Sequence, residues 1–314
     1  MKLVNTILQG DAIERLKDIE DNTIQCVVTS PPYWGLRDYG KDNQIGLEET
    51  PEEYVNNIVN VFREVKRALK DDGTLWLNLG DSYVANKGDS KAGFNERYFG
   101  KKFKTNKQSD TYKNTNIKIK NPNAPKNLVG IPWRVAFALQ ADGWYLRQDI
   151  IWHKPNPMPE SVTDRCTKSH EYIFLLTKSA NYYYDANAIK EPAQDWGTRD
   201  RSNFRKGTKD KLLIHHGLKN ANFAELGRNK RSVWKINIKP YKDAHFATFP
   251  EELPTLCIKA GSKENDIVLD PFFGSGTTGY VAQRLYRKWL GIELNPEYIK
   301  MANKRFSQQE LFIK

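Results

Sequence analysis

Short apolar runs alternate with amphipathic segments along most of this 314-residue chain. The runs that predict buried strands lie at residues 3–8, 24–28, 74–79, 145–152, 172–177, 267–269 and 289–292. Apolar residues at helical spacing lie at residues 11–16, 51–69, 132–142 and 280–286. Thr50, followed by Pro51 and Glu53, is typical of a helix start, because its hydroxyl can cap the first turn. This alternation predicts a doubly wound, mostly parallel α/β sheet.

Two long segments interrupt the alternation and carry a large excess of positive charge. The formal net charge of the chain is +11. Residues 86–126 contain eleven Lys or Arg and three Asp or Glu, and residues 186–231 contain eleven and five. A basic excess in segments without a core pattern favours contact with a polyanion over a uniformly solvated surface. Because no apolar run is long enough to span a bilayer and no secretory signal is visible, we expect a cytoplasmic protein without membrane contact.

The segment from Thr29 to Trp34 reads Thr-Ser-Pro-Pro-Tyr-Trp and directly follows the predicted strand 24–28. Its prolines cannot donate ladder hydrogen bonds, so the chain must leave the sheet as a stiff, extended loop. The loop presents a hydroxyl, carbonyl groups and two large aromatic rings. These groups can accept hydrogen bonds from an amine and stack on a flat ring, which suits a nucleobase. A simple strand-ending turn is the alternative interpretation.

A second motif, Asp-Pro-Phe-Phe-Gly-Ser-Gly-Thr-Thr-Gly, runs from Asp270 to Gly279 between a predicted strand and a predicted helix. The strand that follows ends in Glu293. Glycines at such a turn let the backbone approach a ligand closely, and the acid can accept hydrogen bonds from ribose hydroxyls. The glycine spacing also fits the dinucleotide fingerprint, so a nicotinamide-dependent oxidoreductase is an alternative. In that class, Ser-Pro-Pro-Tyr would have no role.

Together, the two motifs resemble those of the DNA amino-methyltransferases that use S-adenosylmethionine. Their order, with the catalytic loop first and the cofactor loop last, resembles the permuted β group of that family, of the bacterial, archaeal or phage restriction–modification type. Further segments similar to family motifs lie at residues 10–11, 71–81, 150–157, 169–174 and 245–250. The resemblance therefore covers most of the chain.

The resemblance implies a circularly permuted class I methyltransferase fold with an inserted DNA-recognition lobe. Residues 1–185 would form the catalytic part, with residues 86–126 as a mobile basic loop, residues 186–231 the target-recognition lobe, and residues 232–314 the cofactor-binding part. The implied reaction is site-specific methyl transfer from S-adenosylmethionine to the N4 amine of a cytosine flipped out of duplex DNA. N6-adenine is the alternative target. Ser30 favours cytosine, because Ser before Pro-Pro is commoner in the family among N4-cytosine enzymes and Asp points to N6-adenine.

The residue types of the first motif and the resemblance assign roles to individual positions. Ser30 and the Pro31 carbonyl would accept hydrogen bonds from the amine, and Tyr33 beyond Pro32 would stack on the base. The positions implied in cofactor binding are Asp11, Thr29, Phe246, Pro250, Asp270, Phe272, Gly274, Ser275, Gly276, Thr277 and Glu293. Glu293 would hold the ribose and Asp270 would order the loop. Asp11 would face the adenine edge, cap the following helix, or do both.

The expected partners are duplex DNA and a cognate restriction endonuclease, for a monomer or homodimer. DNA contacts are expected from Trp34, Arg37, Lys101, Lys102, Lys104, Arg199, Arg201, Arg205, Arg228, Lys230 and Arg231. The three cysteines have no metal-ligand spacing and none follows a proline, so we expect neither a metal site nor cytosine-C5 methylation. An RNA or protein methyltransferase remains a variant of this prediction. A non-catalytic DNA-binding protein is a further alternative, but both motifs are intact.

Overall fold

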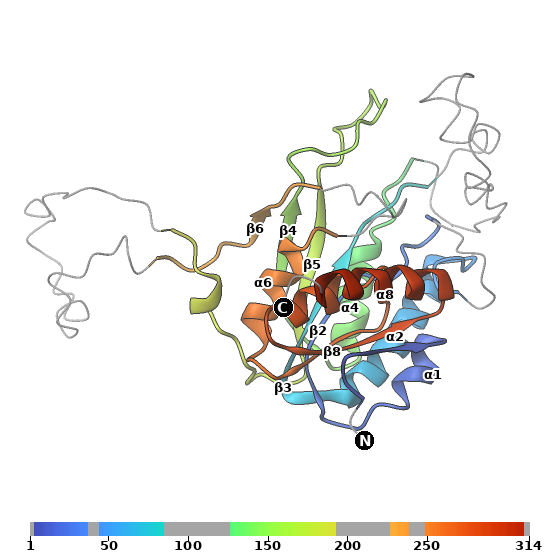
Figure 1. Cartoon of the computed structure of the whole chain (residues 1–314). Helices are drawn as coiled ribbons and strands as arrows, with labels where there is room; N and C mark the ends of the chain where they lie inside the picture. The colour runs from blue at the N-terminus through green and yellow to red at the C-terminus, as the bar shows by residue number, and fades with distance from the viewer. Residues whose placement is uncertain (1–2, 37–43, 85–125, 193–226, 239–248, 311–314) are drawn as a thin grey trace, which may run out of the picture.

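The computed structural model describes residues 3–36, 44–84, 126–192, 227–238 and 249–310. Its strands are β1 (Thr6–Gln9), β2 (Ile24–Thr29), β3 (Leu69–Leu79), β4 (Tyr145–His153), β5 (His170–Thr177), β6 (Val233–Lys235), β7 (Ile267–Asp270) and β8 (Lys288–Glu293). Its helices are α1 (Ala12–Leu16), α2 (Pro51–Ala68), α4 (Ile131–Ala141), α6 (Glu252–Gly261), α7 (Thr277–Arg284), α8 (Pro296–Glu310) and the short 3-10 helix η3 (Asn187–Ile189). Figure 1 shows the helices packed around a central sheet.

The strands of the described residues form one sheet in the order β1-β8-β7-β2-β3-β5-β4-β6. β8 lies parallel between β1 and β7, so the C-terminal unit inserts beside the N-terminal strand. β2 is parallel to β3 and β7, whereas β5 is antiparallel to β3 and β4. The predicted mostly parallel α/β fold is confirmed. The loops after β1, β2, β7 and β8 consequently meet at one carboxyl edge of the sheet.

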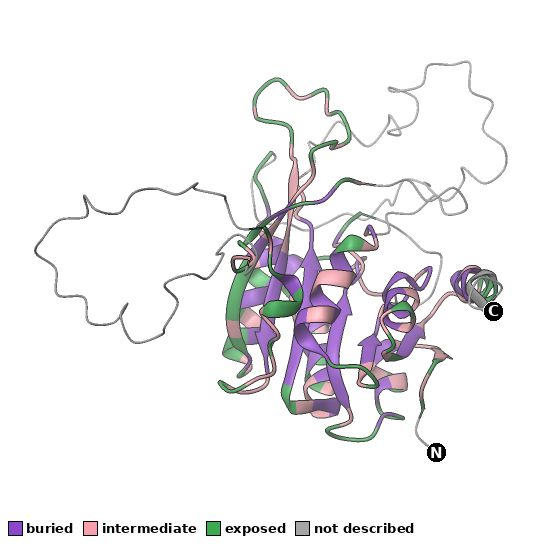
Figure 2. Ribbon diagram, turned by 60° about the vertical axis from the view of Figure 1, so that its left-hand side comes forward, coloured by how far each residue is buried: buried purple, intermediate pink, exposed green. Residues whose placement is uncertain are grey.

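Successive residues of the central strands supply two separate cores. On one face, Val27 and Leu75 join the apolar residues of α1, α2 and α4. On the other face, Val28 and Trp76 join those of α6, α7 and α8. Every residue of β2 is buried, and Figure 2 shows buried strands between partly exposed helices. Because both faces are covered, the central strands read as continuous apolar runs, which is why they could be predicted.

Some element boundaries differ from the prediction. β1 begins at Thr6 rather than at residue 3, and α7 begins at Thr277 rather than near residue 280. α7 begins early because Gly276 adopts a left-handed conformation, with φ of +79°, at its N-cap. The predicted capping box of α2 is confirmed, since Thr50 and Glu53 exchange side-chain to backbone hydrogen bonds.

Four elements, α6, α8, β6 and η3, had no counterpart in the prediction. β6 has three residues, of which the central Trp234 is buried. It pairs with β4 at the edge of the sheet. Its residues therefore continue the sheet of the catalytic part, although the prediction grouped them with the cofactor-binding part.

A buried carboxylate joins β2 to the glycine loop that follows β7. Asp270 Oδ1 accepts hydrogen bonds from the Thr29 hydroxyl at 2.6 Å and from the Phe272 backbone N–H at 3.0 Å. Asp270 Oδ2 accepts from the Thr278 hydroxyl at 2.7 Å. The Asp270 side chain is buried, and this burial raises its pKa to about 6, because the lost hydration outweighs the hydrogen bonds that favour the charged form.

We predict that Asp270→Asn stabilises the cofactor-free protein above pH 6. Asn keeps an acceptor for Thr29 and removes a charge that has to be buried. Because the carboxyl pKa is about 6 in the fold and 3.8 ordinarily, the cost of burying the charge is absent below pH 4 and complete above pH 6. At about 1.4 kcal/mol per pKa unit it reaches roughly 3 kcal/mol.

Denaturant unfolding of both proteins at pH 4 and pH 7.5 measures this difference. The variant should gain stability over the native protein as the pH rises. Asp18→Asn, at an exposed carboxylate beyond α1, is the matched control and should show no such trend. A stability difference between Asp270→Asn and the native protein that does not change with pH would contradict the raised pKa.

Candidate active site

The carboxyl edge of the sheet brings both sequence motifs together. The catalytic loop follows β2 and the glycine loop follows β7, its strand neighbour. Asp11 follows β1, Glu293 is the last residue of β8, and the Gly10 N–H donates to the Glu293 carbonyl at 3.0 Å. Four segments that are far apart in the sequence therefore border one site.

The catalytic loop is held against α2. The Pro32 carbonyl accepts a hydrogen bond from the Tyr54 hydroxyl of α2 at 2.9 Å. Ser30 is half-buried and Pro31 is buried. The loop therefore leaves the sheet in one fixed direction, as its prolines predicted, and Ser30 is positioned where β2 ends.

Trp34 was predicted to contact DNA, but its ring lies in the protein core. Its side chain is 4% exposed and packs in the core beside α2. Its indole N–H donates to the Glu48 carbonyl at 3.0 Å. The amphipathic indole is satisfied inside the protein, so Trp34 anchors the end of the catalytic loop.

Tyr33 is fixed at both its ring and its hydroxyl. A Cβ atom at Gly80 would lie 2.4 Å from Tyr33 Cε2, so the ring lies directly against a backbone without a side chain. The Tyr33 hydroxyl donates to Glu171 Oε2 at 2.8 Å. Burial of the phenol and the negative charge of Glu171 raise the pKa of Tyr33 well above its ordinary value, so the hydroxyl stays protonated.

Glu171 is the centre of a polar network that the sequence did not single out. Its Oε2 also accepts from the Asn78 amide at 3.2 Å, and its Oε1 forms an ion pair with Lys154. Lys154 lies over the Trp152 ring, with Nζ 4.3 Å from the centroid. In the sequence, the segments that contain these residues, 71–81, 150–157 and 169–174, stand out only as similar to family motifs.

The glycine loop is shaped by Phe273 and Glu293. Phe273 inserts between Gly279 and Gly291, where added Cβ atoms would lie 2.6 Å and 2.4 Å from its ring. Glu293 Oε2 accepts from the Gly274 N–H at 2.7 Å, and Oε1 accepts from the Asn295 N–H at 2.7 Å. Burial raises the pKa of Glu293 against these bonds. Oε2 of Glu293 thus holds the glycine loop, whereas Oε1 holds the segment that follows β8.

Gly274 and Ser275 leave capacity for a ligand. Gly274 has φ of +52°, and nothing lies within 4 Å of the position of an added Cβ. The Ser275 hydroxyl is buried and has no hydrogen-bond partner among the described residues. A buried hydroxyl without a partner is costly, so this atom suits a polar group of a bound molecule.

Other predicted cofactor positions are occupied by contacts within the protein. An added Cβ at Gly276 would lie 3.0 Å from Ala302 Cβ, so this glycine permits helix packing rather than close approach of a ligand. Thr277 Oγ1 accepts from Arg305 at 3.0 Å. Thr29 and Asp270 bond to each other, as described above.

Asp11 caps α1, with Oδ1 accepting from the backbone N–H groups of Ile13 and Glu14. This confirms the capping interpretation of Asp11. Phe272 is half-buried in the glycine loop, and Pro250 is buried just before α6. Phe246 lies outside the described residues, so its predicted contact stays a prediction.

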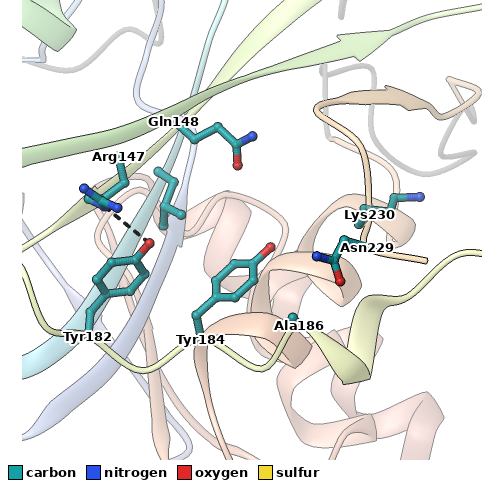
Figure 3. Close-up of a pocket in the computed structure, with 8 residues that line it drawn as sticks. Arg147, Gln148, Tyr182, Tyr184, Ala186, Asn229 and Lys230 are labelled. Atoms are coloured by element: carbon teal, nitrogen blue, oxygen red, sulfur yellow. Dashed lines mark hydrogen bonds between the residues drawn. The ribbon is translucent and has the colours of Figure 1, made fainter. Parts of the chain in front are cut away.

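Besides Trp34, the predicted DNA-contacting residues within the described chain are Arg228, Lys230 and Arg231, which lie just before β6. Glu191 Oε1 lies 3.7 Å from Arg228 and 2.9 Å from Arg231. Lys230 and Asn229 line a cavity of about 300 Å³ with Arg147, Tyr182 and Tyr184 (Figure 3). The remaining predicted contacts, Arg37, Lys101, Lys102, Lys104, Arg199, Arg201 and Arg205, lie outside the described residues.

The described residues contain neither a membrane-spanning helix nor a metal-binding cluster. None of the helices there has the length and hydropathy to cross a bilayer. No group of three or more His, Cys, Asp or Glu residues in those ranges could hold a metal ion. The cysteines are free, with Cys26 and Cys257 buried and Cys166 exposed.

The chain matches known proteins over almost its whole length. A family model described as DNA methylase matches residues 24–304. The type II methyltransferase M.Cfr9I of Citrobacter freundii is 46% identical over 97% of this chain and 88% of its own length. M.SmaI of Serratia marcescens is 47% identical over 95% of this chain and 89% of its own length.

Two solved structures share the fold of this chain. PvuII DNA methyltransferase, described as cytosine-N4-specific, superposes with a TM-score of 0.64 at 20% identity, covering 98% of this chain and 87% of that protein. A Thermus thermophilus protein, described as a proposed DNA modification methylase and solved with S-adenosyl-L-methionine, has a TM-score of 0.58 at 26% identity, covering 96% and 93%. The family predicted from the two motifs is confirmed: this chain belongs to the DNA amino-methyltransferases that use S-adenosylmethionine.

Proposed function

We propose that this enzyme methylates the exocyclic N4 amine of cytosine in duplex DNA. The observation that carries the proposal is the position of Ser30, which follows β2 beside the glycine loop and offers a neutral hydroxyl. In the family that the motifs resemble, serine at this position is commoner among N4-cytosine enzymes. The likeness in fold to an enzyme described as cytosine-N4-specific agrees with it.

The residues of the catalytic loop would act by orientation. The amine of cytosine is a weak nucleophile, because its lone pair is delocalised into the ring. Hydrogen bonds from its two N–H groups to Ser30 Oγ and the Pro31 carbonyl would favour a pyramidal nitrogen. Tyr33, held against Gly80, would stack on a base flipped out of the duplex. Such positioning of both reactants is worth several kcal/mol in general.

The glycine loop fits S-adenosylmethionine, which supplies the methyl group as a sulfonium. Gly274 borders open space, and the Ser275 hydroxyl has no partner among the described residues, so both suit the amino-acid end of the cofactor. Glu293, at the end of β8, would accept hydrogen bonds from the ribose hydroxyls through the remaining lone pairs of its carboxylate. Thr29, Asp270 and Thr277 would hold the shape of this site without contacting the cofactor through their side chains, because those side chains form hydrogen bonds within the protein.

Ser275→Ala tests the cofactor assignment. Without cofactor, the variant should be as stable as the native protein or slightly more stable, because it removes a buried hydroxyl without a partner. Binding of S-adenosylmethionine should weaken about fivefold to tenfold, the worth of one hydrogen bond of about 1 kcal/mol.

Titration calorimetry and thermal unfolding measure the two effects. Ser307→Ala, on the exposed side of α8, is the matched control for loss of a serine hydroxyl. A variant that binds the cofactor as tightly as the native protein would remove Ser275 from the site.

Nucleoside mass spectrometry tests the choice of base. After incubation with labelled S-adenosylmethionine and unmethylated genomic DNA, the digest should contain N4-methylcytosine. Ser30→Ala should bind the cofactor normally and methylate at least a hundredfold more slowly, because the amine loses an acceptor. N6-methyladenine would instead make adenine the target. Unchanged turnover by Ser30→Ala would remove this residue from the catalytic loop's function.

We further propose that residues 186–231, between the catalytic part (1–185) and the cofactor-binding part (232–314), recognise the DNA target. Residues 86–126, within the catalytic part, would cover the bound base. The basic composition of both segments supports this. Glu191 pairs with Arg228 and Arg231 where residues 186–231 join the described structure, which leaves Lys230 and Arg147 at the cavity for phosphate contact. The relatives named type II methyltransferases support a cognate restriction endonuclease as partner.

Lys230→Gln should weaken DNA binding and lower the slope of log K against log salt by about 0.9, the value for one lost phosphate contact. Lys288→Gln is the matched control, because Lys288 is exposed at the amino end of β8, opposite the ligand edge. Fluorescence anisotropy with duplex DNA from 50 to 200 mM salt measures both slopes. An unaltered slope for Lys230→Gln would mean that this lysine is only solvated.

A further inference from the structure

A chain of hydrogen bonds leads from Ser30 to a carboxylate. The Ser30 hydroxyl donates to Tyr33 Oη at 3.4 Å, and Tyr33 Oη donates to Glu171 Oε2 at 2.8 Å. Donation in this series runs from Ser30 toward Glu171. The lone pairs of Ser30 Oγ therefore remain for an N–H group that enters the site.

Methylation of an amine leaves a proton to be removed. An N–C bond forms from the amine lone pair, and the S–C bond of the donor breaks with its electron pair remaining on sulfur. The nitrogen then carries one proton more than the neutral product. A neutral serine hydroxyl is too weak a base to keep it, so a stronger base must accept it.

We propose that Glu171 accepts this proton through Ser30 and Tyr33. The amine proton moves to Ser30 Oγ, the Ser30 proton to Tyr33 Oη, and the Tyr33 proton to Glu171 Oε2. Each hydroxyl gains one proton and loses one, so the result is a neutral methylated amine and a protonated Glu171. The inference rests on the proposed function of Ser30. Glu171 does not touch the base and acts through Tyr33 as a positioning residue.

The surroundings of Glu171 suit an acceptor that is charged before transfer. Lys154 pairs with its Oε1, and the Asn78 amide donates to its Oε2. Lys168 and His170 are basic groups close enough to interact electrostatically with it. The Glu171 side chain is 15% exposed, so water can take up the proton after each turnover.

Asp81, just beyond the end of β3, is a second acid that could be considered as the proton acceptor, but its contacts give it a structural role. Its Oδ1 accepts from the backbone N–H groups of Ser82, Gly130 and Ile131 at 2.9 to 3.0 Å, which holds the start of α4. No hydrogen bond within the described residues connects Asp81 to Ser30 or Tyr33.

The 3.4 Å separation of Ser30 Oγ from Tyr33 Oη is long for a hydrogen bond. Such catalytic contacts often tighten only when substrate binds.

Glu171→Gln tests the relay with little change of shape. Glutamine can still accept from Tyr33 and fills the same volume, but its amide cannot take up the proton. Single-turnover methylation of unmethylated DNA should slow at least a hundredfold, in the range typical of proton transfer. Affinities for S-adenosylmethionine and for DNA should change less than about twofold. Glu160→Gln is the matched control, because Glu160 pairs with Arg165 outside the relay.

Tyr33→Phe is a second variant that leaves the pair of Glu171 and Lys154 intact. It keeps the ring against Gly80 and removes the hydroxyl that carries the proton. It should slow the transfer step to the same extent as Glu171→Gln, and combining the two substitutions should add little, because both interrupt one path.

Chemical rescue separates proton acceptance from mere support of Tyr33. In Glu171→Ala, added carboxylates should restore part of the transfer rate, with acetate more effective than formate and formate more effective than chloroacetate, following their basicity. The double variant Glu171→Ala/Tyr33→Phe should show no rescue. Rescue that does not follow basicity, or a native rate in Glu171→Gln, would overturn the relay. A native enzyme that methylates no amine would overturn the proposed function itself.

Discussion

The geometry of this methyltransferase depends on one buried carboxylate. Asp270 binds the Thr29 hydroxyl at 2.6 Å, and Thr29 directly precedes Ser30 in the chain although it is 241 residues from Asp270. The same carboxylate binds Thr278 in the first turn of α7. The end of the catalytic strand and the start of the glycine loop are thereby fixed to one side chain. Burial raises the pKa of Asp270 to about 6, so some stability is given up for this fixed placement, which in-line transfer between two bound reactants requires.

The glycines of the second motif have different physical roles from one another. Gly279 and Gly291 make room for the Phe273 ring, which stacks on Trp289 with centroids 5.3 Å apart. Gly276 lets the chain turn into α7 against Ala302, and Gly274 alone in the loop borders open space. The spacing of these glycines therefore reflects mainly how the loop packs on its own core. Among the glycines of the loop, Gly274 is the one that a ligand could approach closely.

The sequence predicted those features that depend on local pattern. Central strands such as β2 are covered on both faces and appear as apolar runs, and each motif loop follows directly from such a strand. Features set by long-range register could not be predicted in this way. Glu171 reaches Tyr33 because β5 pairs antiparallel with β3, with Tyr172 opposite Leu79, and no local pattern fixes that register. Trp34 and the three-residue β6 show the same limit, since burial of an aromatic ring and an edge pairing are decided by distant partners.

A hydroxyl at residue 30 changes where the site keeps its negative charge. A carboxylate there would lose its hydration whenever a base entered, and burying an unpaired charge is expensive. In the proposed mechanism, Ser30 and Tyr33 would meet the nucleobase as neutral hydroxyls, while the carboxylate of Glu171 lies behind them, paired with Lys154 and bonded to Asn78. Entry of the nucleobase would then desolvate neutral groups only, and the proton released in transfer would reach the Glu171 carboxylate through hydrogen bonds. A serine in place of an acid at residue 30 would therefore suit amine chemistry, because Glu171 would supply the proton acceptor from a site already paired with Lys154.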